Sequence, residues 1–380
     1  MTGPLSGFRI VEFAGLGPGP FCAMMLADHG AEVIRVDRIG GTVLGADPTG
    51  EFWNRSRKGV SVNLKSERGI AVVRKLCASA DAVIEGYRPG VMERLGLGPD
   101  VLLADNPKLV YGRMTGWGQD GPYANMAGHD INYIALSGVL HAIGRKGEKP
   151  VPPLNLVGDF GGGGMMLAFG MLAALLEAQR SGKGQVVDCA MTEGSAVLMA
   201  MIYSLRAQGR WRDERGANFL DSAAPFYDTY ETADGKFIAI GAIEPQFYAT
   251  LISLAGLADD PAFAQQNDVK AWPEQKQKLA QRIKTKTRAE WSAVFDGQDA
   301  CVAPIMSLDE APSHPHNKAR GMYVEVDGAT HPAPAPRYSR TQTRTPSRLD
   351  TSAGASESIL KQAGFAAGDI AELRQSGVIG

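Results

Sequence analysis

Short hydrophobic segments alternate with amphipathic ones along the first half of the chain. Six runs rich in Val and Ile, each bounded by Gly, Pro or charged residues, have the length and composition of β-strands: 8–14, 32–37, 60–64, 82–87, 109–114 and 185–191. Between them, the segments 21–30 and 66–80 carry apolar residues at helical spacing. This alternation predicts an α/β domain whose parallel sheet is covered by helices on both faces.

The pattern changes in the second half. Residues 227–242 alternate apolar and polar positions around Asp234-Gly235, which predicts a β-hairpin. Helical spacing follows at 247–257, 274–287 and 288–297, and short runs at 301–307 and 321–326 have strand composition. We therefore expect a large domain at 1–190, a helical linker at 191–224, a small α+β domain at 225–330, and a return segment at 331–380 that packs on the large domain.

Composition and charge limit the partners and the compartment. The net charge is −2, with 39 basic and 41 acidic residues, so no global attraction to nucleic acid is expected. The sequence contains no run of about 18 uncharged apolar residues, so no membrane span is expected. The N-terminal residues lack the basic start and apolar core of a secretory signal, so we expect a cytoplasmic protein. Four widely spaced cysteines predict neither a disulfide framework nor a metal site.

Two glycine-rich segments resemble nucleotide-binding loops without meeting their requirements. In AGLGPGP (14–20), Pro20 occupies the third glycine position of the dinucleotide fingerprint. The segment GGGG (161–164) lacks the Lys and Ser/Thr of a phosphate-binding loop. A nucleoside triphosphatase is therefore not expected, although the glycines at 14–20 allow a ligand to pass close to the backbone.

A basic region extends from Arg35 to Arg88, with ten Lys/Arg against six Asp/Glu. Several of these cations lie at or just beyond the ends of predicted strands, where open α/β sheets bind ligands. On composition alone, an ordinary solvated surface is the first explanation of such charges. The alternative is a pocket for a multiply phosphorylated small ligand, to which Arg supplies bidentate contacts.

Three polar residues are candidates for catalysis, and each also has a structural explanation. His129 stands directly before a predicted helix, whose dipole disfavours the imidazolium form and so favours a neutral base. Asp159 lies at the start of the next predicted helix, about 164–179, where an N-cap is the ordinary role. Glu244 precedes Pro245 at a helix start, where a negative charge is favourable in itself.

Longer motifs carry a resemblance to a known family. The chain resembles the α-methylacyl-CoA racemase family, part of the family III CoA-transferase superfamily, and most closely its bacterial members. The resemblance runs along nearly the whole chain and is strongest in six motifs: EGYRPGVMERLG (85–96), RMTGWGQDGP (113–122), GHDINY (128–133), PLNLVGDFGGGG (153–164), SGKGQVVDCAM (181–191) and AIEPQFY (242–248).

The resemblance implies a Rossmann-like large domain, a smaller α+β domain, and an interlocked homodimer with active sites shared between subunits. It implies that His129 and Asp159 form the catalytic pair and that Glu244 of the partner subunit lies near that His. It also implies an acyl-CoA substrate and no cofactor. The CoA moiety is expected along Arg38, Val62, Asn63, Leu64, Lys65, Gly86, Tyr87, Arg88, Arg94, Gly128, Asp130, Ile131, Asn132 and Tyr133.

The implied reaction is epimerisation of a 2-methylacyl-CoA through an enolate, because a thioester acidifies its α-carbon. His129 and Asp159 would act on opposite faces, each as base in one direction and as acid in the other. The backbone N–H of Asp130 is a candidate donor to the enolate oxygen. Two alternatives remain at this point: a CoA transferase with Asp159 as the nucleophile, and a non-enzymatic protein that binds acyl-CoA.

Overall fold

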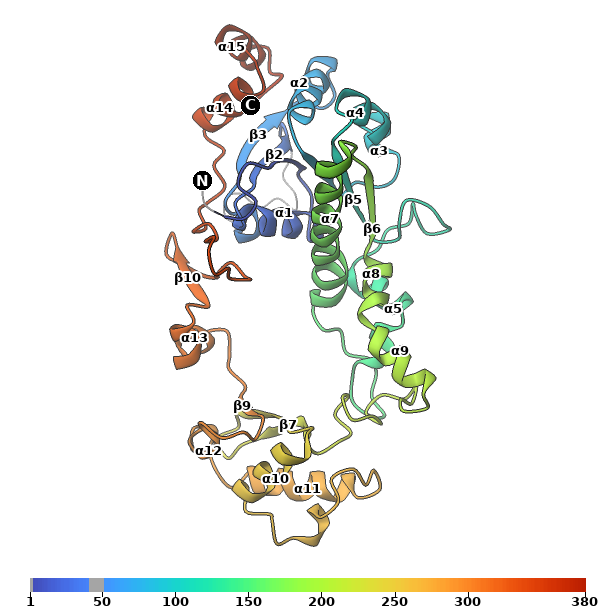
Figure 1. Ribbon diagram of the computed structural model, residues 1–380, viewed down its shortest axis with the longest axis vertical. Helices are drawn as coiled ribbons and strands as arrows, with labels where there is room; N and C mark the ends of the chain where they lie inside the picture. The colour runs from blue at the N-terminus through green and yellow to red at the C-terminus, as the bar shows by residue number, and fades with distance from the viewer. Residues whose placement is uncertain (1–2, 41–50) are drawn as a thin grey trace. The chain divides into compact units, whose positions relative to one another are not determined.

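The computed structural model describes residues 3–40 and 51–380, and the chain folds into two compact units (Figure 1). Within the described residues, unit 1 comprises Met1–Ser137, Pro153–Met199 and Lys318–Gly380, and unit 2 comprises Gly138–Pro152 and Ala200–Asn317. Residues 138–152, which belong to the large domain in the sequence pattern, group here with unit 2. Arg215 explains this grouping, because its guanidinium donates to the carbonyl oxygens of His141 and Glu148.

Unit 1 is built on a six-stranded parallel sheet, which confirms the predicted fold class. Its strands are β1 (Arg9–Phe13), β2 (Glu32–Arg38), β3 (Lys58–Val62), β4 (Ala82–Glu85), β5 (Val110–Thr115) and β6 (Val186–Ala190). Their order is β3-β2-β1-β4-β5-β6. The order reverses between β1 and β4, and such a reversal opens a crevice at the carboxyl ends of the strands.

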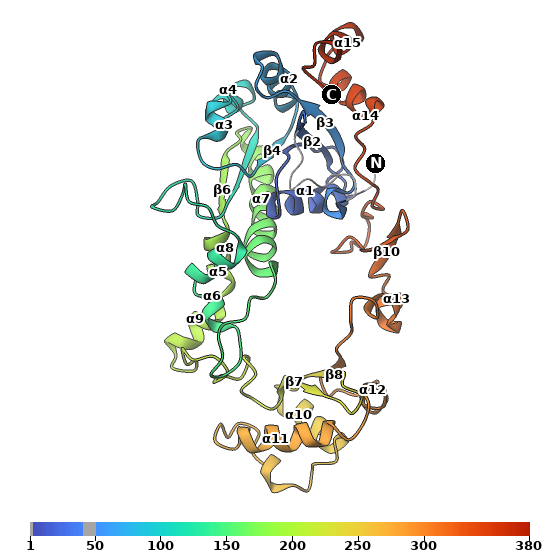
Figure 2. The same ribbon diagram turned by 180° about the vertical axis from the view of Figure 1, so that it is seen from behind.

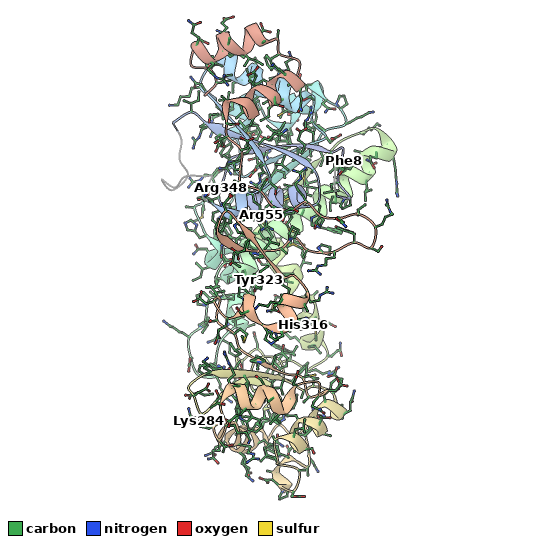
Figure 3. All side chains as sticks on the ribbon, turned by 90° about the vertical axis from the view of Figure 1, so that its left-hand side faces the viewer. Phe8, Arg55, Lys284, His316, Tyr323 and Arg348 are labelled. Atoms are coloured by element: carbon green, nitrogen blue, oxygen red, sulfur yellow. The ribbon has the colours of Figure 1, made fainter. Side chains whose placement is uncertain are left out.

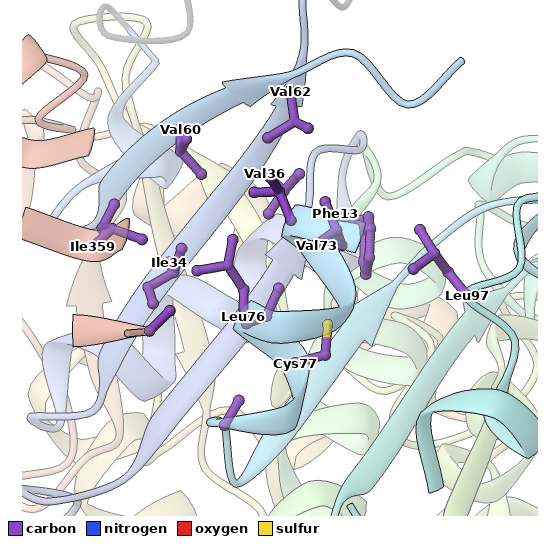
Figure 4. Close-up of a cluster of buried hydrophobic side chains, with 14 of the residues drawn as sticks. Phe13, Ile34, Val36, Val60, Val62, Val73, Leu76, Cys77, Leu97 and Ile359 are labelled. Carbon is purple, nitrogen blue, oxygen red and sulfur yellow. The ribbon is translucent and has the colours of Figure 1, made fainter. Parts of the chain in front are cut away.

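Helices cover both faces of this sheet because its strands alternate their side chains between two hydrophobic clusters. Ile10 of β1 faces one cluster, and its neighbour Val11 faces the other. The first face carries α1 (Pro18–Asp28) and α7 (Met166–Ser181). The second carries α2 (Glu67–Ala78), α14 (Ala353–Gln362) and α15 (Ala367–Gln375), so the end of the chain completes this core (Figure 4).

Shorter elements of unit 1 lie in the connections between the strands and the long helices. They are η1 (Phe52–Asn54), α3 (Val91–Arg94), α4 (Pro99–Asp105), α5 (Asp130–Leu136), the π-helix η2 (Leu156–Met165) and α8 (Met191–Leu198). The helical linker expected at 191–224 begins with α8, which ends at Leu198, and Met199 separates it from the next helix at Ala200–Ala207.

The return of the chain to unit 1 starts with a hairpin of β10 (Tyr323–Val326) and β11 (Ala329–Pro332). Arg55, labelled with Tyr323 in Figure 3, holds this hairpin, because it pairs with Asp28 at 2.6 Å and donates to the carbonyl of Pro332 at 2.8 Å. Further on, the backbone N–H of Gly59 donates to Asp350. The segment therefore packs along β3 and α1.

Unit 2 contains a three-stranded antiparallel sheet of β7 (Tyr227–Glu231), β8 (Phe237–Gly241) and β9 (Val302–Pro304). The predicted hairpin is confirmed, with Gly235 at φ 72° in the turn. The helices are α6 (Val139–Ala142), α9 (Ala200–Ala207), α10 (Pro245–Leu254), α11 (Trp272–Ile283) and α12 (Arg288–Phe295), with short turns η3 (Pro261–Phe263) and η4 (Ala311–Ser313). A further short helix, α13 (Pro315–Ala319), begins in unit 2 and ends in unit 1, which resumes at Lys318. Figure 2 shows α10 and α11 beside the hairpin, and their apolar side chains share one core with the hairpin and with the fully buried Trp291 of α12.

One helical segment of the described chain, Leu156–Ser181, is long and apolar enough to cross a membrane by length and composition. It joins η2 to α7, and its inner face is buried against the sheet through Leu167, Met171 and Leu175. A core helix passes the same test of length and composition, so this segment is not in itself evidence of a membrane span.

Candidate functional site

Asp159 lies inside η2 and not at a helix N-cap, so the structural role considered for it from the sequence is wrong. The helix starts at Leu156 with Asn155 as its N-cap, about eight residues before the predicted start at 164. π-Helical turns are rare and occur mostly at functional sites. This turn can form because the residues after Asp159 and Phe160 are four glycines, which let the wide helix contact its neighbours directly.

The glycines serve close helix packing. A Cβ at Gly194 of α8 would lie 1.8 Å from the carbonyl oxygen of Gly162, and a Cβ at Gly162 would lie 2.5 Å from the backbone nitrogen of Ser195. Both distances are far below any real contact, so the backbones of η2 and α8 touch. The GGGG segment therefore fixes the helix that carries Asp159.

The carboxylate of Asp159 is half-buried and held from two sides. The Asn155 amide donates to its Oδ2 at 3.1 Å, and the Asp159 backbone N–H donates to Oδ2 of Asp130 at 2.8 Å. Burial raises the pKa of Asp159; the Asn155 hydrogen bond and a positive charge on His129 oppose this, and the Asp130 charge adds to it. A Cβ at Gly17 would lie 3.3 Å from Asp159 Oδ2, so the glycine-rich loop after β1 closes against this carboxylate.

His129 is the N-cap of α5, as the sequence predicts, and its side chain is exposed. Asn132 fixes the cap, because its Oδ1 accepts the His129 backbone N–H at 3.0 Å. The Tyr133 ring packs directly against Gly128, the residue before His129. Its hydroxyl donates to the Gly128 carbonyl, and a Cβ at Gly128 would lie 2.7 Å from the ring. The GHDINY motif thus shapes one tight turn that presents His129 beside Asp159.

Tyr133 links this turn to the neighbouring strand end. Burial raises its pKa to about 12; the negative charge of Asp159 adds to the shift, and the positive charge of Arg88 opposes it. Asp159 in η2 and Arg88 in the loop after β4 are therefore both near enough to act on the Tyr133 hydroxyl.

The predicted CoA-binding residues all belong to unit 1. They follow the carboxyl ends of β2, β3 and β4 or lie in α3 and at the start of α5. The side chains of Arg38, Lys65, Arg88 and Arg94 are exposed. Those of Val62, Leu64, Asp130 and Tyr133 are buried. Val62 and Leu64 belong to the hydrophobic core, so only their backbone can face a ligand.

Most cations of the basic region have structural partners. The ion pairs are Arg35–Asp37, Arg55–Asp28, Arg57–Glu12, Lys58–Glu32, Arg68–Glu372 and Arg74–Asp105. Among the residues that the structure describes, Arg38, Lys65 and Arg88 pair with no carboxylate. These three cations lie at or beyond the carboxyl ends of β2, β3 and β4 and are available to an anion.

The loop Gly86–Arg88 is anchored from beneath by Glu85. Its Oε2 accepts the Tyr87 backbone N–H at 2.7 Å and its Oε1 accepts from Arg113 at 3.0 Å. Burial raises the pKa of Glu85 to about 7, against these two stabilising contacts. Arg88 is therefore presented by a fixed turn and not by a free loop.

Glu244 is the exposed N-cap residue of α10 and belongs to unit 2, so unit 1 by itself contains His129 and Asp159 but not Glu244.

Sequence reasoning missed Asn155 and the carboxylate of Asp130. The i to i+4 spacing of Asn155 and Asp159 is the signal that points to the first. No group of three His, Cys, Asp or Glu among the described residues is arranged to hold a metal ion.

Known proteins are similar to this chain along nearly its whole length. The chain is 48% identical to the mouse α-methylacyl-CoA racemase over 379 residues, covering 99% of this chain and 97% of that protein, and 46% identical to the human racemase over 377 residues, with the same coverage. The mouse succinyl-CoA:glutarate CoA-transferase is 31% identical over 361 residues, covering 89% of this chain and 81% of that protein. A CAIB/BAIF family protein from Brucella suis has the same fold, with a TM-score of 0.82, 27% identity, and coverage of 96% of this chain and 100% of that one. The model of CoA-transferase family III matches residues 5–355, and the chain therefore belongs to that family.

Proposed function

We propose that this protein is an α-methylacyl-CoA racemase that interconverts (2R)- and (2S)-2-methylacyl-CoA thioesters. It is an enzyme, an isomerase that acts on acyl-CoA. The observation that carries the proposal is the meeting of an exposed His129 and a half-buried Asp159 at one site, beside cations that no carboxylate of the described chain neutralises. The racemases of mouse and human, at 48% and 46% identity, support it.

The chemistry follows from this pair. One group removes the α-proton of the thioester, and the other returns a proton to the opposite face of the planar enolate. A carboxyl with a raised pKa suits both tasks, because its carboxylate is a stronger base than an ordinary one and its acid form can still return the proton to the enolate. The backbone N–H of Asp130, at the start of α5, is the proposed donor to the enolate oxygen. No cofactor is needed, since the thioester itself activates the α-carbon.

The proposed function is tested by incubation of the enzyme with (2R)-2-methylacyl-CoA in deuterium oxide. The expected result is formation of the (2S) epimer together with deuterium at the α-carbon. Chiral chromatography measures the epimer, and mass spectrometry measures the deuterium. Transfer of CoA to an added dicarboxylate, with no α-deuterium in the recovered thioester, is the result expected of a transferase instead. The cytoplasmic location expected from the sequence stays part of this proposal.

Arg38 and Arg88 are proposed to bind the phosphates of CoA. Replacement of either by Ala is expected to weaken CoA binding by about 1.5–3 kcal/mol, the range for a lost charged hydrogen bond. Isothermal titration with CoA measures the effect. Arg68→Ala is the matched control, because Arg68 is exposed in the same unit and pairs with Glu372. Unchanged affinity in both Arg38→Ala and Arg88→Ala would mean that the phosphates bind elsewhere.

The proposal includes an interlocked homodimer in which Glu244 of one subunit serves the site of the other. Support comes from the outer face of the segment Leu156–Ser181. Phe169 is 73% exposed and Leu176 is 59% exposed, in line with Met165 and Leu156, which are also exposed. β6, the last strand of the sheet, lies next to this helix, and its outer edge pairs with no other strand of the described residues. An exposed apolar face of this extent is typical of a subunit interface.

The proposed dimer predicts the mass of the protein in solution and the effect of a charge on the exposed apolar face. Sedimentation is expected to give twice the 40.4 kDa mass of the chain at assay concentrations. Phe169→Glu is expected to shift the protein toward monomer and to lower activity in step, because it buries a charge in the interface. Glu177→Gln, at an exposed polar position of the same helix, is the control. A fully active monomer would exclude shared active sites.

A further inference from the structure

We infer that the carboxylate of Asp130 and the amide of Asn155 are opposed positioning residues: together they hold Asp159, and they set the pH range in which it can exchange its proton. The inference rests on the proposed function for its kinetic consequence. It adds a role for two side chains that the proposed reaction does not itself use.

The first part of the argument is the place of Asp130. Its side chain is 5% exposed, although it follows the exposed His129 directly. The start of α5 turns it inward, where Oδ2 accepts the Asp159 backbone N–H at 2.8 Å. A Cβ at Gly158 would lie 2.4 Å from the same oxygen, so glycine at 158 is required for the contact. The contact ties α5 to the first turn of η2, which brings the two proposed catalytic residues together.

The second part of the argument is the other carboxylate oxygen of Asp130. Oδ1 of Asp130 is buried and has no hydrogen-bond partner among the described residues. A buried carboxylate with one unmatched oxygen is costly, and a purely structural link would be better served by a neutral acceptor such as Asn. The retained charge therefore suggests a role beyond holding the turn.

The third part is the balance at Asp159. Asn155, four residues earlier on the same helix, donates to the ionised carboxylate and so favours it. Asp130 is a like charge across the turn and disfavours it. A group that must both take and give a proton during each catalytic cycle needs its two forms close in free energy. Asn155 lowers the pKa of Asp159 and Asp130 raises it, so the two side chains shift this balance in opposite directions.

Few other charges face Asp159 from the elements packed around η2. α5 contributes His129 and Tyr133 in addition to Asp130. The loop before α1 contributes the backbone of Gly17, and α1 itself presents Pro18 and Phe21 to the glycines. α8 presents Met191, Gly194 and Ser195, and β6 presents the Cys189 thiol to the Gly163 carbonyl, all of them uncharged near neutral pH.

The test is the pH profile of kcat/KM for epimerisation. The active pair holds one proton between two groups, so the acid limb marks the entry of a second proton, and its position follows Asp159. Asp130→Asn keeps the acceptor and removes the charge, and is expected to move the acid limb to lower pH by about one unit. Asn155→Ala removes the donor and is expected to move it to higher pH by a similar amount. The double variant is expected to return it close to the wild-type position.

The controls separate this role from general damage. Asp100→Asn removes an exposed charge of α4 in the same unit and is expected to leave the limb in place. Shifts of the two variants in the same direction, or no shift in either, would overturn the inference. If Asp130→Asn does not fold, the required upward shift in Asn155→Ala still decides the question.

A readout without turnover distinguishes this inference from the proposed function. The carboxyl stretch of Asp159, taken as the infrared difference between each protein and its Asp159→Asn form, can be titrated in the resting enzyme. The same two opposite shifts are expected there. Wild-type enzyme without α-proton exchange would refute the racemase, whereas exchange with unshifted titrations would refute only the roles of Asp130 and Asn155.

Discussion

Asp159→Ala and His129→Ala are each expected to abolish net epimerisation in both directions while slow α-proton exchange survives. Inversion needs one group to take the proton and another to give one on the opposite face. With a single group left, the enzyme can only wash deuterium into the epimer whose α-hydrogen faces that group. Any residual epimerisation is expected to be slower by at least about 10²–10⁴-fold in kcat, the usual contribution of one acid or base.

The measurement follows both epimers by chiral chromatography and α-deuterium by mass spectrometry. His316→Ala and Asp100→Ala, at exposed positions of α13 and α4, are the matched controls. The identity of the epimer that exchanges in each variant assigns a face to each residue. If the protein were a transferase, Asp159→Ala would stop turnover and His129→Ala would leave most of it. Substantial epimerisation by Asp159→Ala would refute the two-base reaction, once water is shown not to replace the carboxylate.

The architecture of unit 1 could be read from the sequence because its strands carry a strong local pattern. Val and Ile runs are buried on both faces of a parallel sheet, so they stand out from the amphipathic helices between them. The strand order could not be read from that pattern, since it depends on contacts between distant segments such as Ile10 and Ala82. The sequence predicts the return of the chain from residue 331, but not that β10 already belongs to unit 1. Its hairpin with β11 is held there by Arg55 and Asp28, nearly three hundred residues away.

The candidate site also has one part that the sequence predicts and another that depends on contacts between distant segments. His129 at a helix N-terminus follows from local spacing, and the structure has it as the N-cap of α5. The π-helical turn at Asp159 does not follow from spacing, because GGGG has a weak preference for any helix and takes this form only against α8. The burial of Asp130 was hidden for a similar reason. An acidic residue in the first turn of a helix is usually solvated, and here the missing side chain of Gly158 lets it turn inward.

The basic region shows why charge counting alone is a poor guide to a binding site. Arg57 lies in the basic region and is fully buried against Glu12, where it also donates to two backbone carbonyls. It serves the fold beneath the loop after β1. Arg38 and Arg88, which look no different in the sequence, are exposed at the strand ends. Only the position relative to the sheet separates the two kinds of cation.

Gly194→Ala is expected to destabilise unit 1 by about 2–3 kcal/mol and to lower activity with it. Its Cβ would lie 1.8 Å from the Gly162 carbonyl oxygen, which is backbone and cannot rotate away, so α8 and η2 must move apart. Because Asp159 lies three residues before Gly162 on η2, the separation also displaces the proposed catalytic carboxylate. Chemical denaturation monitored by circular dichroism measures the stability, and the epimerisation assay measures the activity.

Gly368→Ala in α15 is the matched control for this substitution. Gly368 also lies in a helix, but a Cβ there has nothing within 4 Å, so the same change is expected to leave activity intact and to gain up to about 1 kcal/mol. The contrast separates close packing from helix propensity, which favours Ala at both positions. Wild-type stability in Gly194→Ala would mean that the two backbones do not touch, and the GGGG segment would then need another explanation.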